Sequence, residues 1–200
     1  MAWLILVPWA ETPWRADRRL ASRTPMSLTD GGRAQAAVWA DKLARHALAA
    51  VYSSGERSGI ETAEILAMRC GARHHVAPAL CELDVGLWEG LTPDMLKQRF
   101  PKTFKLWRTD PSGVRPPGGE AIDAATTRVD SALTAVTRRQ PGRSTAVVLG
   151  PLVFGLARCV MESVTAADVW WLEHDEPLCY ELDAVDARAV APRRGVRSGR

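Results

Sequence analysis

Cysteine is scarce in this chain and is never clustered. The 200 residues include four cysteines, Cys70, Cys81, Cys159 and Cys179, and no two have the close spacing of a zinc site or a redox dithiol. We therefore expect free, buried thiols and neither a metal site nor a disulfide framework. No residue pattern indicates a bound cofactor.

The chain also lacks an apolar run of the roughly 20 residues that a membrane-spanning helix needs. Residues 1–10 are mostly apolar, but no positive charge precedes them and Pro8 and Glu11 cut the run short, which argues against a signal peptide. A buried strand explains this segment better. We predict a cytoplasmic protein without a membrane partner.

Positive charge is concentrated at the end of the chain. The formal net charge is +3, but four arginines lie in the last eight residues, so the first 192 residues carry −1. That balance argues against a specific nucleic-acid partner. We predict one domain over residues 1–190 and a basic, disordered tail over 191–200. Weak attraction of this tail to nucleic acid or a membrane surface is the lesser alternative.

Short apolar runs alternate with helical patterns along most of the chain. The predicted strands are 3–7, 49–52, 144–149 and 178–182. The predicted helices are 30–44, 60–68, 121–139 and 152–161, with short helical pieces between prolines over 82–120. This order predicts a three-layer α/β fold with a mostly parallel sheet, whose carboxyl edge carries the functional site.

Four short motifs follow one another in this framework. They are Leu28-Thr29 with Gly32 and Gln35-Ala36; Ser53-Ser54 with Thr62-Ala63; Leu80 and Glu82 with Gly86 and Trp88-Glu89-Gly90; and Pro117-Gly118-Gly119-Glu120. Each motif is weak by itself, but their order and spacing are specific. On these motifs the chain resembles the histidine phosphatase superfamily, of the phosphoglycerate mutase-like kind, from Trp3 to about Met161.

The resemblance breaks down at the catalytic positions. Active members of that family carry Arg-His-Gly after the first strand, an Arg on the helix after Ser-Ser, an acidic proton donor and a second His after the fourth strand. In this chain Pro8 and Ser58 occupy the two Arg positions, and Trp9 and Gly150 occupy the two His positions. Glu82 retains the position of the proton donor. The resemblance therefore implies a degenerate member without the catalytic histidines.

These substitutions remove the groups that phosphoryl transfer to an imidazole requires. A histidine nucleophile offers a ring-nitrogen lone pair, while cations neutralise the phosphate oxygens. The indole nitrogen of Trp9 can only donate a hydrogen bond, and Ser58 offers one hydroxyl in place of a guanidinium. Arg57 is adjacent to Ser58, but on a helix the two side chains point about 100° apart, so we do not expect Arg57 to replace the missing arginine.

The four histidines of the chain occupy none of the catalytic positions. His46 lies at a predicted helix end, where a cationic ring is favoured. His74 and His75 begin a polar strand and are expected at the surface. His174 lies among carboxylates, where an exposed acidic turn is expected rather than a metal site.

The former phosphate pocket is the expected binding site. Trp9 is predicted to fill its floor, and a surface-loop tryptophan without function is an equal alternative. The acids Glu11, Glu82 and Glu89 are expected to gather there, and Arg19 is a further candidate binding residue. Such a pocket would favour neutral or cationic ligands over phosphate.

We interpret the chain as a pseudophosphatase with a binding or regulatory role. Its partner would be an unidentified protein or small molecule, and a homodimer is compatible with this interpretation. The alternative is an active phosphomonoesterase or phosphoglycerate mutase-type enzyme with a non-standard active site. The fold does not decide between the two, because one fold hosts many functions.

Overall fold

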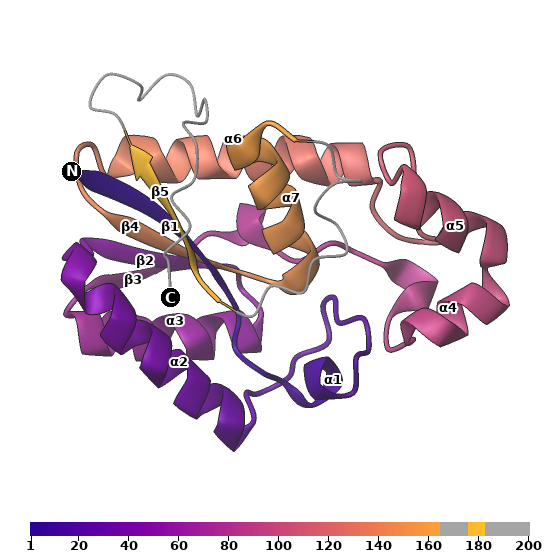
Figure 1. The fold of residues 1–200 in the computed structure, drawn as a ribbon, viewed down its shortest axis with the longest axis horizontal. Coiled ribbons are helices and arrows are strands. Elements are labelled where there is room, and N and C mark those ends of the chain that lie inside the picture. Colours follow the sequence, from indigo (N-terminus) through magenta and orange to yellow (C-terminus); the bar gives the residue numbers. More distant parts are fainter. Residues whose placement is uncertain (165–175, 183–200) are drawn as a thin grey trace.

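A five-stranded sheet forms the centre of the computed structural model, which describes residues 1–164 and 176–182 (Figure 1). Its strands are β1 (Ala2–Pro8), β2 (Ala50–Ser53), β3 (Arg73–Val76), β4 (Thr145–Leu149) and β5 (Leu178–Leu182). The strand order is β3-β2-β4-β1-β5; the first four strands run parallel and β5 runs antiparallel to β1. The predicted α/β class with a mostly parallel sheet is confirmed.

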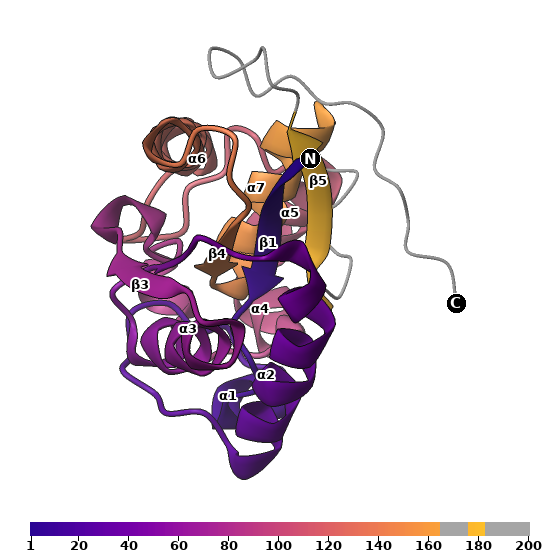
Figure 2. The ribbon, with the colours of Figure 1, turned by 90° about the vertical axis from the view of Figure 1, so that its left-hand side faces the viewer.

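Helices cover both faces of this sheet, which makes three layers (Figure 2). The helices α2 (Asp30–Leu43) and α3 (Arg57–Cys70) cover one face, and α6 (Ile122–Arg139) and α7 (Pro151–Glu162) cover the other. Successive side chains of a strand point to opposite faces. Ile5 of β1 therefore packs with α2 and α3, while Leu4 packs with α6 and α7. This double burial explains why β1 reads as a continuous apolar run.

Short helical pieces occupy the loops, as predicted for residues 82–120. They are α1 (Pro13–Ala16), η1 (Ala44–His46), η2 (Pro78–Leu80), η3 (Gly86–Trp88), α4 (Pro93–Arg99) and α5 (Pro101–Thr109). Prolines open α4 and α5, where their missing N–H is not needed. Trp107 of α5 packs edge-on against Trp88 with ring centroids 4.8 Å apart. This contact attaches the α4–α5 insertion to the core.

A close backbone crossing joins the third sequence motif to the fourth. Gly86 has φ of +51°, and a Cβ at this position would overlap the carbonyl oxygen of Pro117. Leu87 N donates to that same oxygen at 2.9 Å, and Glu120 N donates to Asp84 O at 2.8 Å. Both motifs are rich in glycine because the two backbones touch here.

Two expectations about side chains are wrong. Burial, together with the charge of Arg45, lowers the pKa of His46, so its neutral ring is favoured. Of the four cysteines, all free, only Cys159 is buried; the others are half-buried. His75 is exposed and His74 half-buried, close to the predicted surface location.

Some predicted features fall outside the described residues. They are His174, the domain end near residue 190 and the tail 191–200. Within 1–164 and 176–182, no helix combines the length and apolarity needed to cross a bilayer.

The backbone crossing can be tested with two glycines. Both Gly86 and Gly71 have a left-handed φ, +51° and +63°, but a Cβ at Gly71 would have no atom within 4 Å. Gly71→Ala should cost about 1 to 2 kcal/mol of unfolding free energy from conformation alone. Gly86→Ala should cost clearly more, because Pro117 must also move. Urea denaturation measures both losses, and equal losses would contradict the crossing.

Candidate functional site

Trp9 lies at the carboxyl edge of the sheet, directly after β1. Its side chain is 2% exposed. Its backbone N–H donates to Leu149 O of β4 at 2.8 Å, and its carbonyl accepts from Arg15 Nη1 at 2.9 Å. The alternative of a tryptophan in a surface loop is therefore wrong. Within the described residues the indole Nε1 has no hydrogen-bond partner.

The first turn of α3 is tied to the end of β1 by a threonine of the second motif. Ala10 N donates to Thr62 Oγ1 at 3.0 Å, and that hydroxyl donates to Ser58 O at 2.8 Å. Ser58 is buried. Arg57 has a side chain 63% exposed and pairs with Glu61 Oε1 at 2.9 Å. The guanidinium is thus engaged at the surface, in line with the expectation that it does not replace Ser58.

Glu82 is completely buried and caps the amino end of α7. Its carboxyl group accepts three backbone N–H groups: Leu83 N at 2.6 Å, Leu152 N at 2.9 Å and Val153 N at 3.0 Å. Two of these donors belong to the first turn of α7, which has no partner for them within the helix. A side chain from a distant segment therefore completes this helix end.

Burial also sets the protonation state of Glu82. It raises the pKa of this carboxyl group to about 8. The three N–H donors favour the charged form but do not outweigh burial, and the nearby Glu56 carboxylate raises the pKa further. At neutral pH the group is largely the uncharged acid.

Gly150, at the start of α7, leaves room for both large side chains. A Cβ at position 150 would overlap Glu82 Oε2 and would lie 3.0 Å from Trp9 Cη2. A Cβ at Gly59 of α3 would lie 3.8 Å from another atom of the same ring, Trp9 Cε3. Trp9 and Glu82 together fill the space between the first turns of α3 and α7.

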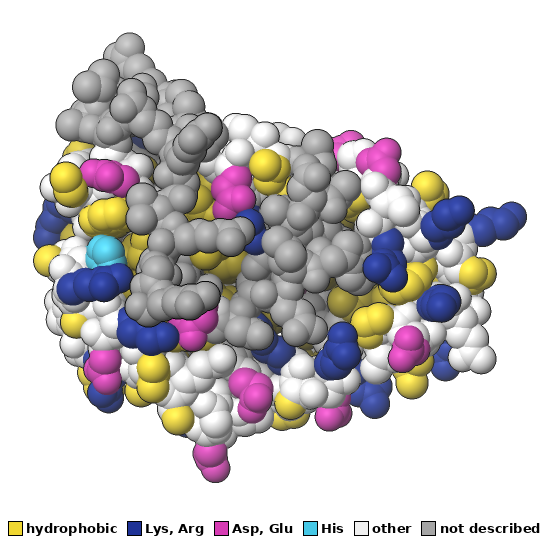
Figure 3. Space-filling view, viewed as in Figure 1, with side chains coloured by type: hydrophobic (Ala, Val, Ile, Leu, Met, Phe, Trp, Pro, Cys, Tyr) yellow, Lys and Arg dark blue, Asp and Glu magenta, His cyan; other side chains and the backbone are white. Residues whose placement is uncertain are grey.

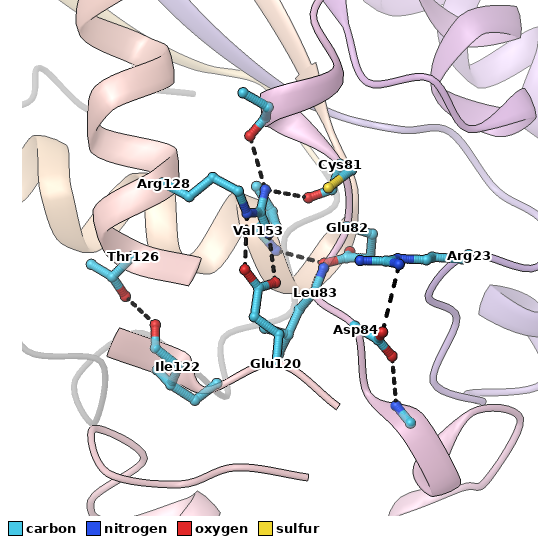
Figure 4. Close-up of polar contacts among 12 residues, drawn as sticks. Arg23, Cys81, Glu82, Leu83, Asp84, Glu120, Ile122, Thr126, Arg128 and Val153 are labelled. Atoms are coloured by element: carbon cyan, nitrogen blue, oxygen red, sulfur yellow. Dashed lines mark hydrogen bonds and ion pairs between the residues drawn. The ribbon is translucent and has the colours of Figure 1, made fainter. Parts of the chain in front are cut away.

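The segment that carries Glu82 is held from outside by Arg128 of α6 (Figure 4). Its guanidinium donates to Ala79 O at 2.8 Å and to Cys81 O at 2.9 Å, and it pairs with Glu120 Oε2 at 2.8 Å. Two carbonyls and a carboxylate thus share one planar donor group. The segment is therefore held on one side by Arg128, through its backbone carbonyls, and on the other by α7, through the Glu82 side chain.

Comparison with known proteins shows the family of this chain. The sequence profile described as "Histidine phosphatase superfamily (branch 1)" matches residues 4–192. The chain belongs to the histidine phosphatase superfamily.

Relatives in this superfamily cover most of the chain. Phosphoserine phosphatase 1 of Hydrogenobacter thermophilus is 27% identical over 85% of this chain and 81% of its own length. Phosphoglycerate mutase-like protein 4 of Arabidopsis thaliana is 30% identical over 72% of this chain and 64% of its own. The structure of Bacillus stearothermophilus YhfR superposes with a TM-score of 0.82 at 25% identity, covering 92% of each chain.

Not every predicted site residue of this superfamily member reaches Trp9 and Glu82. Glu11 Oε1 accepts from the Thr29 hydroxyl at 2.6 Å, and Glu89 Oε1 accepts from Thr24 N at 2.9 Å. Arg19 Nη1 donates to the carbonyl of residue 90 at 2.9 Å. Among the described residues, no hydrogen bond or ion pair joins these three to the filled site. Through these bonds the three side chains anchor neighbouring loops.

A surface depression of about 410 Å³ lies beside the filled site of this superfamily member. Its lining residues are Arg23, Pro25, Gly55, Glu56, Arg57, Ile60, Pro78 and Cys81. Glu56, whose Oε1 accepts from Glu82 N at 2.8 Å, is a site residue that was not predicted from the sequence. An acid directly before a helix, after the Ser-Ser turn, is a signal that could have identified it.

The raised pKa of Glu82 predicts a pH-dependent stability. Because its pKa is about 8 when folded and 4.5 ordinarily, the folded state holds the proton between these values. The free energy of unfolding should therefore fall by up to a few kcal/mol as pH rises from about 5 to about 8. Urea denaturation across this range measures the slope. Glu82→Gln should flatten it and the exposed Glu64→Gln should not; an unchanged slope in Glu82→Gln would contradict the assignment.

Proposed function

We propose that this protein is a noncatalytic member of the histidine phosphatase superfamily with a binding role. The observation that carries the proposal is the filled site, where the Glu82 carboxyl group caps α7 beside the buried indole of Trp9. A phosphate group needs that same volume and those same N–H donors if it is to bind at the amino end of α7. Glu82 and the phosphate would therefore compete for one place.

The side chains at this place lack the chemistry of phosphoryl transfer. The nitrogen lone pair of the Trp9 indole belongs to the ring, so it cannot attack phosphorus. Pro8, Ser58 and Gly150 supply no positive charge to the equatorial oxygens. Glu82 is fully buried, so it cannot give its proton to an ester in solvent.

The alternative of an active phosphatase is favoured by the names of the relatives, among them phosphoserine phosphatase 1. It requires another nucleophile. Cys81 lines the open depression, but burial raises the pKa of its thiol, which lowers the fraction of the reactive thiolate.

A serine and histidine pair is the other candidate for such a nucleophile. Ser53 Oγ lies 2.8 Å from His74 Nε2, and its hydroxyl donates to Ser54 O at 2.8 Å. Because that single proton is already used, Ser53 must accept from Nε2–H, and a donating nitrogen cannot act as a base. Ser53 is also fully buried. This pair is structural in the proposed function.

The depression at Arg23 and Arg57 is the proposed place for a small ligand. Its volume of about 410 Å³ falls within the roughly 300 to 1,000 Å³ of small-molecule sites. Binding there would leave Trp9 and Glu82 in place.

The proposal predicts an absence of phosphatase activity. Purified protein should hydrolyse p-nitrophenyl phosphate, phosphoserine and 3-phosphoglycerate no faster than Glu82→Gln, since no group can form a phosphoenzyme. The H. thermophilus phosphoserine phosphatase 1 serves as the positive control on phosphoserine. Turnover above the variant, or acid-labile phosphate on the protein, would show that the site is active.

Restoring the catalytic set should be strongly cooperative. Trp9→His should remain inactive, because catalytic groups that act as a unit gain little when one returns alone. The combination of Pro8→Arg, Trp9→His, Ser58→Arg and Gly150→His is expected to give measurable turnover at reduced stability, because the side chain at 150 must displace Glu82. Phosphatase rates and circular dichroism compare the variants. A Trp9→His rate near that of the combination would mean that the phosphate site was intact.

A further inference from the structure

The α4–α5 insertion carries a concentration of positive charge. Residues 93–109 hold five lysines and arginines and one aspartate, a net charge of +4. The other described residues, 1–92, 110–164 and 176–182, carry a net charge of −1. Figure 3 shows dark blue side chains gathered over α4 and α5, at the right of the view. Positive charge is therefore concentrated on this insertion.

Most of these cations have no acidic partner. Lys97, Arg99, Lys102 and Lys105 are exposed, and within residues 1–164 and 176–182 none of them forms an ion pair. Several cations elsewhere are paired, such as Arg69 with Asp41 at 2.9 Å. The described part of the chain thus leaves these four cations uncompensated.

The outward face of α5 combines this charge with an apolar side chain. Lys105 and Leu106 follow Lys102 by three and four residues, which makes each of them a neighbour of Lys102 on the helix surface. Leu106 is 54% exposed, while Phe104 and Trp107 on the inward face are buried. The packing of Trp107 on Trp88 holds the helix in place, so the outward face is organised before any partner binds.

We propose that the outward face of α4 and α5 binds an acidic protein segment that carries a leucine-like side chain among its carboxylates. The carboxylates would pair with the free cations, and the apolar group would pack on Leu106. Complementary charge speeds association and selects the partner. This inference goes beyond the binding role proposed for the depression and does not depend on it.

Two other anionic partners fit the surface less well. An anionic bilayer takes up the apolar face of an amphipathic helix, but the apolar face of α5 is packed against the core. Single-stranded nucleic acid binds by stacking on exposed aromatic rings, and on α5 Phe104 and Trp107 are buried.

The test measures binding of the full chain to a fluorescent peptide of leucines set among glutamates. Lys102→Glu with Lys105→Glu should weaken binding at low salt by at least about tenfold, because two attractions become repulsions. The matched control is Arg139→Glu with Arg143→Glu, which changes the net charge by the same amount. These residues lie at and just after the carboxyl end of α6, the end that is farther from α5 (Figure 1). The control should stay within about twofold of the unmodified protein.

A second arm tests the apolar contact. Leu106→Ser should weaken binding of the leucine peptide and leave binding of a matched serine–glutamate peptide unchanged. Phosphatidylserine vesicles and single-stranded DNA are titrated in parallel. Equal losses in the two charge-reversal variants would overturn the proposal. So would tighter binding of vesicles or DNA that depends on Lys102 and Lys105, because the partner would then be of another class.

Discussion

The capping of α7 by Glu82 is the interaction on which the rest of the site depends. An acid buried at 0% exposure is tolerated because it is uncharged at neutral pH and accepts three backbone N–H groups. Gly150 makes it possible, since any Cβ there would overlap the carboxyl group. Arg128 then fixes the segment from outside through the carbonyls of Ala79 and Cys81. The helix end, the loop and the sheet edge are thereby joined.

The buried Trp9 indole closes the carboxyl edge of the sheet, but it leaves one buried N–H group without a partner among the described residues. A phosphate pocket gathers cations around an open, polar volume, and such a volume is hard to keep when the cations are lost. Here the Trp9 indole supplies apolar bulk between α3 and α7. The remaining cost is the buried Nε1–H, which has no partner among the described residues and is worth roughly 1 to 3 kcal/mol. The edge is closed and apolar rather than charged.

In the proposed function, recognition is displaced from the strand ends to the periphery. The depression at Arg23 and Arg57 lies next to the closed edge, and the α4–α5 insertion presents free cations further out. Both surfaces are built on segments that the core holds firmly, α3 in one case and the Trp88–Trp107 contact in the other. The core thus holds these segments rigidly, and the side chains on their outer faces are the ones available for binding.

The sequence by itself determined the fold class and the superfamily. Apolar runs such as β1 and motifs such as Pro117-Gly118-Gly119 express local requirements, namely burial on both faces and close backbone contact. The tertiary structure decided where side chains go. Glu82 meets α7 some 70 residues later in the chain, while Glu11 and Glu89 turn to loop hydroxyls and amides. Such pairings, and the neutral state of Glu82, depend on how distant segments pack, which no local pattern encodes.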